Sequence, residues 1–263
     1  MKRLLYLVIL LLLLLQACST PPTAEPPTAT SAPTDTPVPT ATPQPTDTPT
    51  PEPTSTPDKA ATAAAQSTAS AQTVLAELED ILGEEDIPYQ NGQLLWQQEK
   101  PLMVSLKGPG WDYAEIDDNL VGRNFILKSD VTWDATGIII CGVVFRSEPD
   151  LVNGKQYEFM YLRLSGLPAW QIAYNEFGRF DNTFTKTQYS DAIDQENGAT
   201  NQVVLVAEDE QFNLFINGVH QGRYFDYSKQ RMDGNFAFSG SQDSGEGTCN
   251  FENSWVWALA ETV

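Results

Sequence analysis

The side chains that act as nucleophile and base in many hydrolases are scarce in this chain. His220 is its only histidine, so a Ser–His–Asp arrangement would have to be built on this residue. No Gly-x-Ser-x-Gly sequence is present to hold a nucleophilic serine. His220 follows the Asn217-Gly218 turn, where an exposed hairpin residue is the simpler interpretation. We therefore expect no catalytic residue.

Acidic residues form a second group with chemical potential. They gather in the sequence DYAEIDDN at 112–119 and around Asp181-Asn182. Oxygen ligands from such loops are suited to Ca²⁺, but neither group has an ordered ligand spacing. The acids at 207–210 fall in a predicted hairpin turn, where solvation explains them. We expect no cofactor, with calcium as the open alternative.

Aromatic residues and one arginine form a third group, which could bind sugar. In the run YEFMYLRLS, alternation predicts the aliphatic residues inside and the aromatic residues and the arginine outside. The next predicted strand could add two more rings to this outer face, in a register that alternation does not fix. Sugar C–H faces pack on aromatic rings, and arginine donates to hydroxyls. The hypothetical glycan site consists of Tyr157, Tyr161, Arg163, Trp170 and Tyr174. The alternative is that these rings simply cover the sheet.

The N-terminal sequence has the features of an export signal. Lys2 and Arg3 precede a twelve-residue apolar run, Leu4–Leu15, which is shorter than the roughly 20 residues of a membrane span and is typical of a secretory signal. Leu15-Gln16-Ala17-Cys18 resembles the lipobox of bacterial lipoproteins. The resemblance implies an extracytoplasmic protein, anchored to the cell membrane or outer membrane by acyl chains on Cys18. A signal anchor that happens to contain a cysteine is the alternative.

Export also decides the state of the other two cysteines. Once Cys18 is acylated, Cys141 and Cys249 are the thiols that remain in an oxidising space, and both fall in predicted strands. We therefore predict a Cys141–Cys249 disulfide. A zinc site is then excluded, because one histidine cannot hold the metal.

Composition divides the chain into four segments. Residues 1–17 are the signal peptide, and 18–58 form a lipidated, Pro/Thr-rich linker that has nothing to bury and should be disordered. Residues 59–83 are rich in alanine and predict a helix. Only its last two turns carry an apolar stripe, which favours a partly frayed helix over a short coiled coil. Residues 84–263 form the remaining domain, and the oligomeric state stays open.

The domain at 84–263 consists of short strand-like runs separated by Asn-Gly, Ser-Gly and Asp-Gly turns. No stretch of this domain has a helical periodicity long enough to predict a helix instead. This pattern is typical of an antiparallel sandwich or barrel.

The formal net charge of −20 repels nucleic acid, so we expect no nucleic-acid partner.

Several motifs in the second half of the chain carry a family resemblance. They are Ile216-Asn217-Gly218, Asp226, the stretch 234–240 and Phe251-Glu252-Asn253, with CGVVFRSE and residues 157–164 upstream. This part resembles the concanavalin A-like lectin/glucanase superfamily, and bacterial lipoproteins with laminin G-like or 3-keto-disaccharide hydrolase-like domains. The resemblance implies an all-β fold, an antiparallel two-sheet jelly-roll sandwich. Glu252 and Ser254 depart from the pattern, which has an aspartate and an apolar residue there.

The same resemblance directs attention to one catalytic pattern. Glucanases of the superfamily use a strand with E-x-D-x-x-E, in which two carboxylates supply nucleophile and acid. Glu115-Ile116-Asp117 is the nearest match here, but Leu120 occupies the place of the second acid. A retaining mechanism therefore lacks its partner at this spacing.

The sequence CNFENSWVW at 249–257 raises the question of where two tryptophans lie. The family pattern places Phe251 in the core. Uninterrupted alternation would place Trp255 and Trp257 beside it, whereas a bulge at Glu252-Asn253 would turn them to the other face. In either case we favour a buried seam over an exposed binding site.

Three classes of function remain. The first is a lipid-anchored protein that displays a β-sandwich binding module for an extracellular or cell-wall glycan. The second is a glycan-acting hydrolase of the 3-keto-disaccharide hydrolase-like type, and the third is a structural or adhesive envelope protein. We favour the binding module, because the sequence offers no convergent pair of acids.

Overall fold

The computed structural model describes residues 59–164, 166–181 and 184–260. The predicted signal peptide, Cys18 and the linker up to residue 58 lie outside this part. Residues Ser55–Val263 form one compact unit, which contains every helix and strand described below. Within the described residues, no helix is both long and apolar enough to span a membrane.

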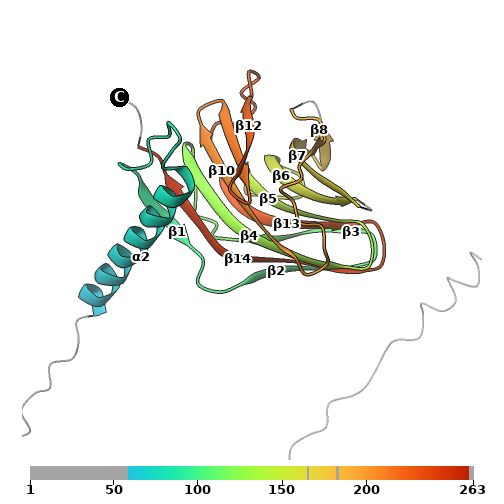
Figure 1. Cartoon of the computed structure of the whole chain (residues 1–263), viewed down its shortest axis with the longest axis horizontal. Coiled ribbons are helices and arrows are strands. Elements are labelled where there is room, and N and C mark those ends of the chain that lie inside the picture. The colour runs from blue at the N-terminus through green and yellow to red at the C-terminus, as the bar shows by residue number, and fades with distance from the viewer. Residues whose placement is uncertain (1–58, 165, 182–183, 261–263) are drawn as a thin grey trace, which may run out of the picture. The chain divides into compact units, whose positions relative to one another are not determined.

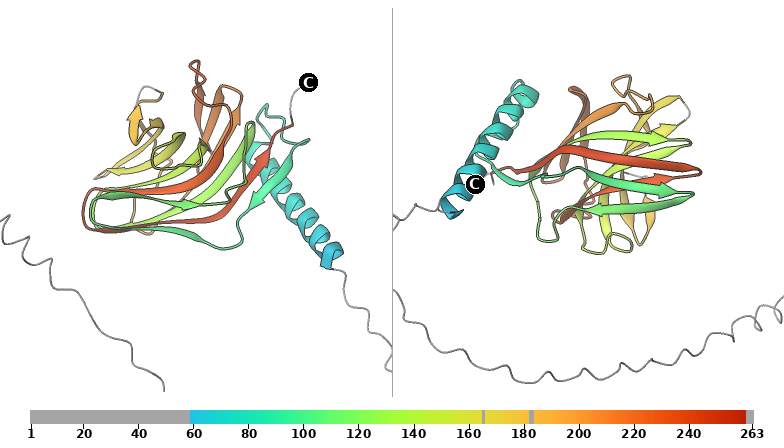
Figure 2. Two further views of the ribbon diagram at one scale, coloured as in Figure 1. Left: turned by 180° about the vertical axis from the view of Figure 1, so that it is seen from behind. Right: turned by 90° about the horizontal axis from the view of Figure 1, so that it is seen from below.

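Two antiparallel sheets pack face to face in a concanavalin A-like jelly-roll sandwich, as predicted (Figure 1). Both sheets are twisted and curled, as the views from behind and from below show (Figure 2). The strand order of sheet A is β1 (Gln93–Gln97), β14 (Glu246–Ala258), β4 (Phe125–Ala135), β10 (Thr200–Glu208), β11 (Gln211–Ile216) and β12 (Val219–Phe225), with β2 (Leu102–Lys107) also paired to β14. The strand order of sheet B is β3 (Gly110–Glu115), β13 (Asn235–Gln242), β5 (Ile139–Ser147), β6 (Lys155–Leu164), β7 (Leu167–Glu176) and β8 (Arg179–Asp181), with β9 (Gln188–Tyr189) also paired to β7.

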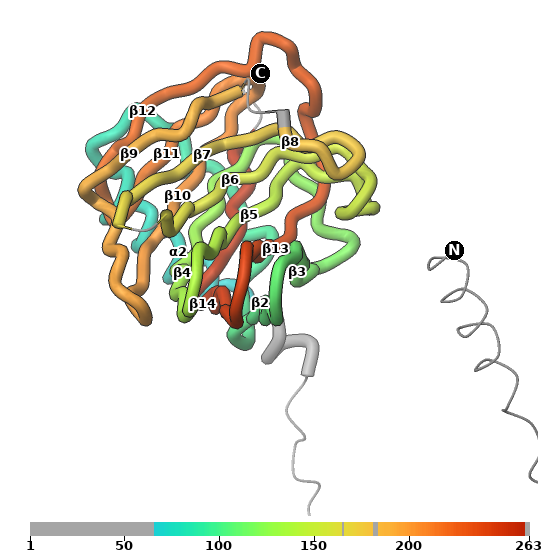
Figure 3. Tube along the Cα trace, turned by 90° about the vertical axis from the view of Figure 1, so that its right-hand side faces the viewer, coloured from blue at the N-terminus to red at the C-terminus, as the bar shows by residue number. Residues whose placement is uncertain are grey.

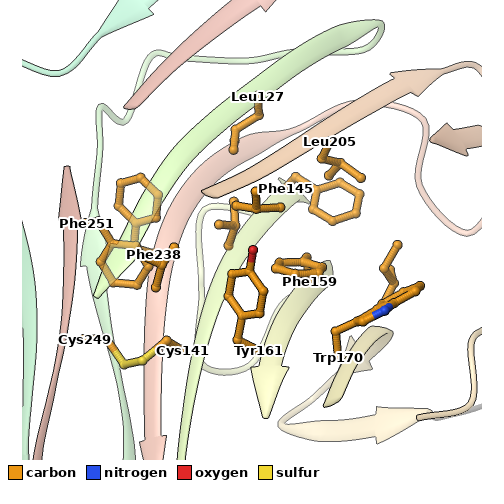
Figure 4. Close-up of a cluster of buried hydrophobic side chains, with 14 of the residues drawn as sticks. Leu127, Cys141, Phe145, Phe159, Tyr161, Trp170, Leu205, Phe238, Cys249 and Phe251 are labelled. Atoms are coloured by element: carbon orange, nitrogen blue, oxygen red, sulfur yellow. A yellow bond between two sulfur atoms is a disulfide. The ribbon is translucent and has the colours of Figure 1, made fainter. Parts of the chain in front are cut away.

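Alternate side chains of both sheets fill the space between them. On β11, Phe212, Leu214 and Ile216 point inward and are fully buried, because alternate side chains of a strand face the same side. Across the gap, Phe238 of β13 stacks on Phe251 of β14 with ring centroids 4.3 Å apart. Figure 4 shows part of this core, which is built almost entirely from aliphatic and aromatic residues. Burial of this apolar area is the main force that holds the sheets together.

The predicted disulfide between Cys141 and Cys249 is confirmed. Cys141 belongs to β5 in sheet B and Cys249 to β14 in sheet A, so the bond joins the two sheets through the core (Figure 4). Their Cα atoms are 5.6 Å apart, and 108 residues separate them in the sequence. Closing a loop of this length stabilises the fold by about 4–5 kcal/mol in the chain-entropy model.

The last strand is a buried seam with a bulge in its middle. Its register against β4 shifts between Glu252 and Trp255, and Asn253 has a left-handed backbone with φ of 50°. Phe251 therefore lies between the sheets, while Trp255 and Trp257 lie on the outer face of sheet A. Both tryptophans are nearly inaccessible to solvent, at 1% and 3% exposed.

The last turns of helix α2 (Lys59–Leu82) pack on that outer face of sheet A, at one end of the sandwich (Figures 1 and 2). Val74, Leu78 and Leu82 are fully buried and form a second apolar cluster with Phe215 and with the two tryptophans of β14. The apolar stripe at the end of the helix thus packs on its own domain. This explains why only the last turns needed apolar residues.

Glu77 fixes the helix on the sheet through polar contacts. One carboxylate oxygen lies 2.7 Å from Lys128 Nζ, and the other accepts a hydrogen bond from Trp255 Nε1 at 2.8 Å. The Lys128 side chain is only 5% exposed, whereas that of Glu77 is 33% exposed, so a buried ammonium group meets a half-buried carboxylate. Removal of Glu77 would leave the buried charge of Lys128 without this partner, which is costly. The ion pair therefore specifies where the helix docks.

Candidate functional site

Sheet B turns most of the predicted aromatic surface inward. Tyr157, Tyr161 and Trp170 are each 1% exposed and belong to the core between the sheets. The prediction that Tyr157 and Tyr161 face outward is therefore wrong. Strand β6 carries large side chains on both faces, and the rings fill the gap between the sheets, which leaves Glu158 and Met160 on the outer face. Figure 3 shows β5, β6 and β7 side by side in this sheet.

Arg163 also points inward, where it holds loops in place. Its guanidinium donates to the carbonyl oxygens of Gln195 at 3.1 Å and of Gly137 at 3.2 Å. The Tyr161 hydroxyl donates to the carbonyl oxygen of Gln202 at 2.8 Å. These contacts give both side chains structural roles.

Tyr157 and Tyr174 reach one end of the sandwich, where the structure has a cavity. It has a volume of about 240 Å³ and opens between β6, β7 and the loop that follows β12. We name it the mouth cavity. Its lining residues are Tyr157, Tyr174, Phe184, Phe225, Asp226, Ser228 and Gln230. Two of the five predicted ligand-binding residues thus meet at this cavity, through a geometry that the sequence did not predict.

Asp226 holds the loop that closes the mouth cavity. One of its carboxylate oxygens accepts from the Tyr157 hydroxyl and from the Gln230 amide at 3.1 Å. The other accepts from the Ser228 amide at 3.0 Å and from the Ser228 hydroxyl. Burial favours a higher pKa for Asp226, but the hydrogen bonds outweigh it and lower the pKa. The ionised carboxylate is therefore fully occupied with positioning the loop.

The Tyr174 hydroxyl belongs to a residue that lines the mouth cavity. It is buried and has no hydrogen-bond partner among the described residues. Burial raises its pKa, so it keeps its proton and can both donate and accept. A buried hydroxyl without a partner costs free energy. A ligand hydroxyl in the cavity would supply the missing partner.

Two exposed aromatic rings lie at the end of β12 and at the start of the loop that follows it. Phe225 is 43% exposed and Tyr227 is 83% exposed. Their rings are nearly parallel, with an angle of 13° between the planes and centroids 5.8 Å apart. Sequence analysis missed both residues as binding candidates. The available signal was the run Tyr224–Tyr227, which places rings on both sides of an acid where a predicted strand ends.

The outer face of sheet B is closed by its own side chains. Glu158 is fully buried there and accepts a hydrogen bond from the Ser239 hydroxyl. Gly142 makes room for this pair, since a Cβ at that position would collide with both side chains. On the same face Trp111 of β3 meets Phe180 of β8, with ring centroids 4.7 Å apart. Burial raises the pKa of Glu158 to about 8, against the effect of the Ser239 hydrogen bond.

The acidic group predicted at 112–119 lies at the edge of sheet B. Glu115, Asp117 and Asp118 line a second cavity of about 280 Å³ together with Glu148. Among the described residues, no group of three or more His, Cys, Asp or Glu side chains could hold a metal ion. Leu120, which stands where the glucanase pattern has its second acid, is an apolar residue buried in the core.

Comparison with known proteins adds few constraints. No protein-family model matches the chain, and no curated protein matches it. Among solved structures it is similar to the carbohydrate-binding module CBM66 from Bacillus subtilis, with 17% sequence identity and a TM-score of 0.43 over 59% of this chain and 94% of that one.

Two further structures have similar scores. A Bacillus licheniformis beta-glucanase is 8% identical with a TM-score of 0.43, over 65% of this chain and 89% of that one. Sheep galectin-11 is 12% identical with a TM-score of 0.35, over 54% of this chain and 98% of that one. These values are too low to carry an argument about function, which must rest on the residues of this chain.

Proposed function

We propose that the protein is a lipid-anchored, extracytoplasmic carbohydrate-binding module whose site is the mouth cavity. In this proposal, acyl chains on Cys18 hold it to a bacterial membrane, and the Pro/Thr-rich linker lets the sandwich reach glycans of the envelope or its surroundings. The observation that carries the proposal is the Tyr174 hydroxyl, which has no hydrogen-bond partner among the described residues, in a cavity that is also lined by the exposed ring of Phe225, on which Tyr227 stacks.

These groups match the chemistry of a neutral sugar. A sugar ring offers C–H faces that pack on aromatic rings, and hydroxyls that both donate and accept hydrogen bonds. The mouth cavity holds about 240 Å³, below the range of about 300–1,000 Å³ that is usual for drug-sized ligands. A single sugar unit is the ligand size that this volume favours. The net charge of −20 favours neutral over acidic sugars.

The mouth cavity favours binding over hydrolysis. Glycosidases that retain configuration use two carboxyl groups about 5–5.5 Å apart, and inverting enzymes use two about 6.5–9.5 Å apart. Asp226 is the single carboxylate among the residues that line the cavity. Its acceptor positions are filled by Tyr157, Ser228 and Gln230. A hydrolytic role would therefore need a second acid that this cavity does not provide.

Isothermal titration of the unit 55–263 with neutral monosaccharides and oligosaccharides tests the proposal. We expect Tyr174→Phe to weaken binding about three- to tenfold, because one hydrogen bond contributes about 0.5–1.5 kcal/mol and 1.4 kcal/mol is a factor of ten. The free variant should be at least as stable to heat as the wild type, because the hydroxyl that it lacks has no partner to lose.

A second variant and a control locate the site. Tyr227→Ala should weaken binding by removing an exposed ring, without a large effect on stability. Tyr189→Ala is the matched control: Tyr189 is 62% exposed and lies on β9, which pairs with the start of β7, away from Tyr174. Unchanged binding in both mouth variants would place the site elsewhere. Absence of binding across the panel would favour the adhesive role.

A further inference from the structure

The hairpin between β7 and β8 carries an aromatic residue where its turn prefers another type. Glu176 pairs with Arg179, so Phe177 and Gly178 alone form the turn. Both have positive φ, at 53° and 69°. Two-residue turns of this kind favour Asn-Gly, because asparagine and glycine adopt positive φ most readily. A bulky side chain at the first position is therefore unfavourable for the turn itself.

Packing does not explain Phe177 either. Its side chain is 67% exposed, so the ring gains little from burial in the free protein. A residue that neither favours its backbone conformation nor fills the core points to a role outside folding. An exposed ring at this turn is useful if a ligand packs on it.

The place of Phe177 indicates what that ligand could be. With Glu176, Arg179 and Phe180 it lines a shallow hollow of about 400 Å³, which we name the hairpin cavity. Tyr174 lines both the hairpin cavity and the mouth cavity. The two cavities are thus neighbours that share one tyrosine.

The two cavities differ in how they are enclosed. The mouth cavity is bounded by residues of β6, β7, the segment after β8 and the loop after β12, so it surrounds a ligand on several sides. The hairpin cavity is lined by β7, β8 and their turn only. It therefore offers one platform, with the Arg179 guanidinium as a donor for hydroxyl groups.

We propose that Phe177 is the stacking platform of a second sugar subsite, so that the protein binds the end of a neutral oligosaccharide. The terminal sugar occupies the mouth cavity, and the next sugar packs on Phe177 in the hairpin cavity. This inference rests on the proposed function, because it assigns the first sugar to the mouth cavity. It specifies the ligand as a chain of at least two sugar units. It also gives Phe177 a role in binding, although this residue is unfavourable for the conformation of its turn.

The test uses Phe177→Asn, a substitution that should improve the turn and damage the site. Titration of the unit 55–263 with matched mono-, di- and trisaccharides of glucose, galactose, mannose and fructose gives the affinity gained from the second unit. In the wild type we expect a gain of about five- to tenfold, typical of one stacked ring. Phe177→Asn should abolish this gain, keep the monosaccharide affinity, and raise or preserve the melting temperature. Phe177→Trp should retain the gain.

The outcomes separate the inference from the proposed function. If monosaccharides bind at the mouth but Phe177→Asn leaves the gain from the second unit unchanged, the second subsite is wrong and the proposed function stands. The second subsite is equally wrong if disaccharides never bind better than monosaccharides. If no sugar binds, or if Tyr174→Phe leaves the affinity unchanged, the proposed function is wrong and the second subsite is wrong with it.

Discussion

A carboxyl group on a closed sheet face is costly to ionise, and Glu158 is in that position. It is fully buried, one oxygen accepts from Ser239, and the other has no partner among the described residues. Burial raises its pKa from 4.5 to about 8. At neutral pH the folded protein therefore keeps a proton on Glu158 that the unfolded chain releases.

This difference predicts a pH dependence that Glu158→Gln should reduce. Below about pH 4.5 the group is protonated in both states, and its contribution to stability is complete. As the pH rises from 4.5 to 8 only the unfolded chain ionises, so the free energy of unfolding falls by up to about 1.4 kcal/mol per pH unit. Glutamine keeps an acceptor for Ser239 and does not titrate. In urea unfolding, the wild type and Glu158→Gln should therefore have similar free energies of unfolding at pH 4. At pH 8–9 the variant should be more stable than the wild type by about 2–5 kcal/mol.

The control for this experiment is Glu115→Gln. Glu115 lies on the edge strand β3 of the same sheet and is exposed, so its substitution should leave the pH profile of the wild type unchanged. If Glu158→Gln loses stability between pH 5 and 8 as steeply as the wild type, Glu158 is ionised in the folded state and the argument from burial is wrong.

Alternation along a strand predicts residue orientation only where the two faces differ in character. On β11 the inward Phe212 and Leu214 alternate with Asn213, so alternation alone gives their orientation. On β6 rings alternate with aliphatic residues, so both faces are candidates for the core, and the prediction chose the wrong one. Phe177 was out of reach for a related reason, because nothing local indicates that a turn residue lies beside Tyr174.

Packing between helix α2 and the outer face of sheet A stabilises both elements. Leu78 is fully buried between the helix and the sheet. We expect Leu78→Ala to lower the free energy of unfolding by about 2–5 kcal/mol, through lost burial and the cavity left behind. Urea unfolding of the unit 55–263 measures this.

An exposed position on the same helix provides the control. Gln72→Ala should change the free energy of unfolding by no more than about 0.5 kcal/mol, because Gln72 is exposed. Equal effects of the two substitutions would show that the helix is not docked in solution. In that case Trp255 and Trp257 would be open to water, and their fluorescence would report it.

The sequence predicted that these elements exist, but not how they assemble. Turns and alternation revealed the strands, and the bulge at Glu252-Asn253 was one of two alternatives for the last strand. The partners of β14, which are β1, β2 and β4, lie far from it in sequence. No local pattern encodes such pairing, and none indicated that the stripe of α2 would find its partner in sheet A.

At the scale of the whole molecule, the start of helix α2 and the proposed site lie apart. Helix α2 begins on the side of the sandwich remote from β8, in all views of the ribbon (Figures 1 and 2). The linker joins the domain at Lys59, the first residue of this helix. An anchor at Cys18 would therefore leave the mouth and hairpin cavities accessible to ligands.

The anchor can be tested by one substitution. We expect Cys18→Ala to prevent acylation, so that the protein is either released from membranes or left unprocessed, whereas the neighbouring Ser19→Ala should still fractionate with them. Cell fractionation and the mass of the mature N-terminal peptide measure both effects. A single acyl chain gives only marginal membrane binding, so firm retention of the wild type requires more than one chain.

The disulfide gives this experiment an independent readout of compartment. If the Cys18→Ala chain is exported, its Cys141 and Cys249 should still be joined, because the bond forms in an oxidising space. Non-reducing peptide mapping would detect it. A variant with two free thiols would mean that the chain stayed in a reducing compartment and that its loss from the membrane says nothing about acylation. A variant that stays bound to membranes, is cut normally and carries the disulfide would contradict the lipid anchor.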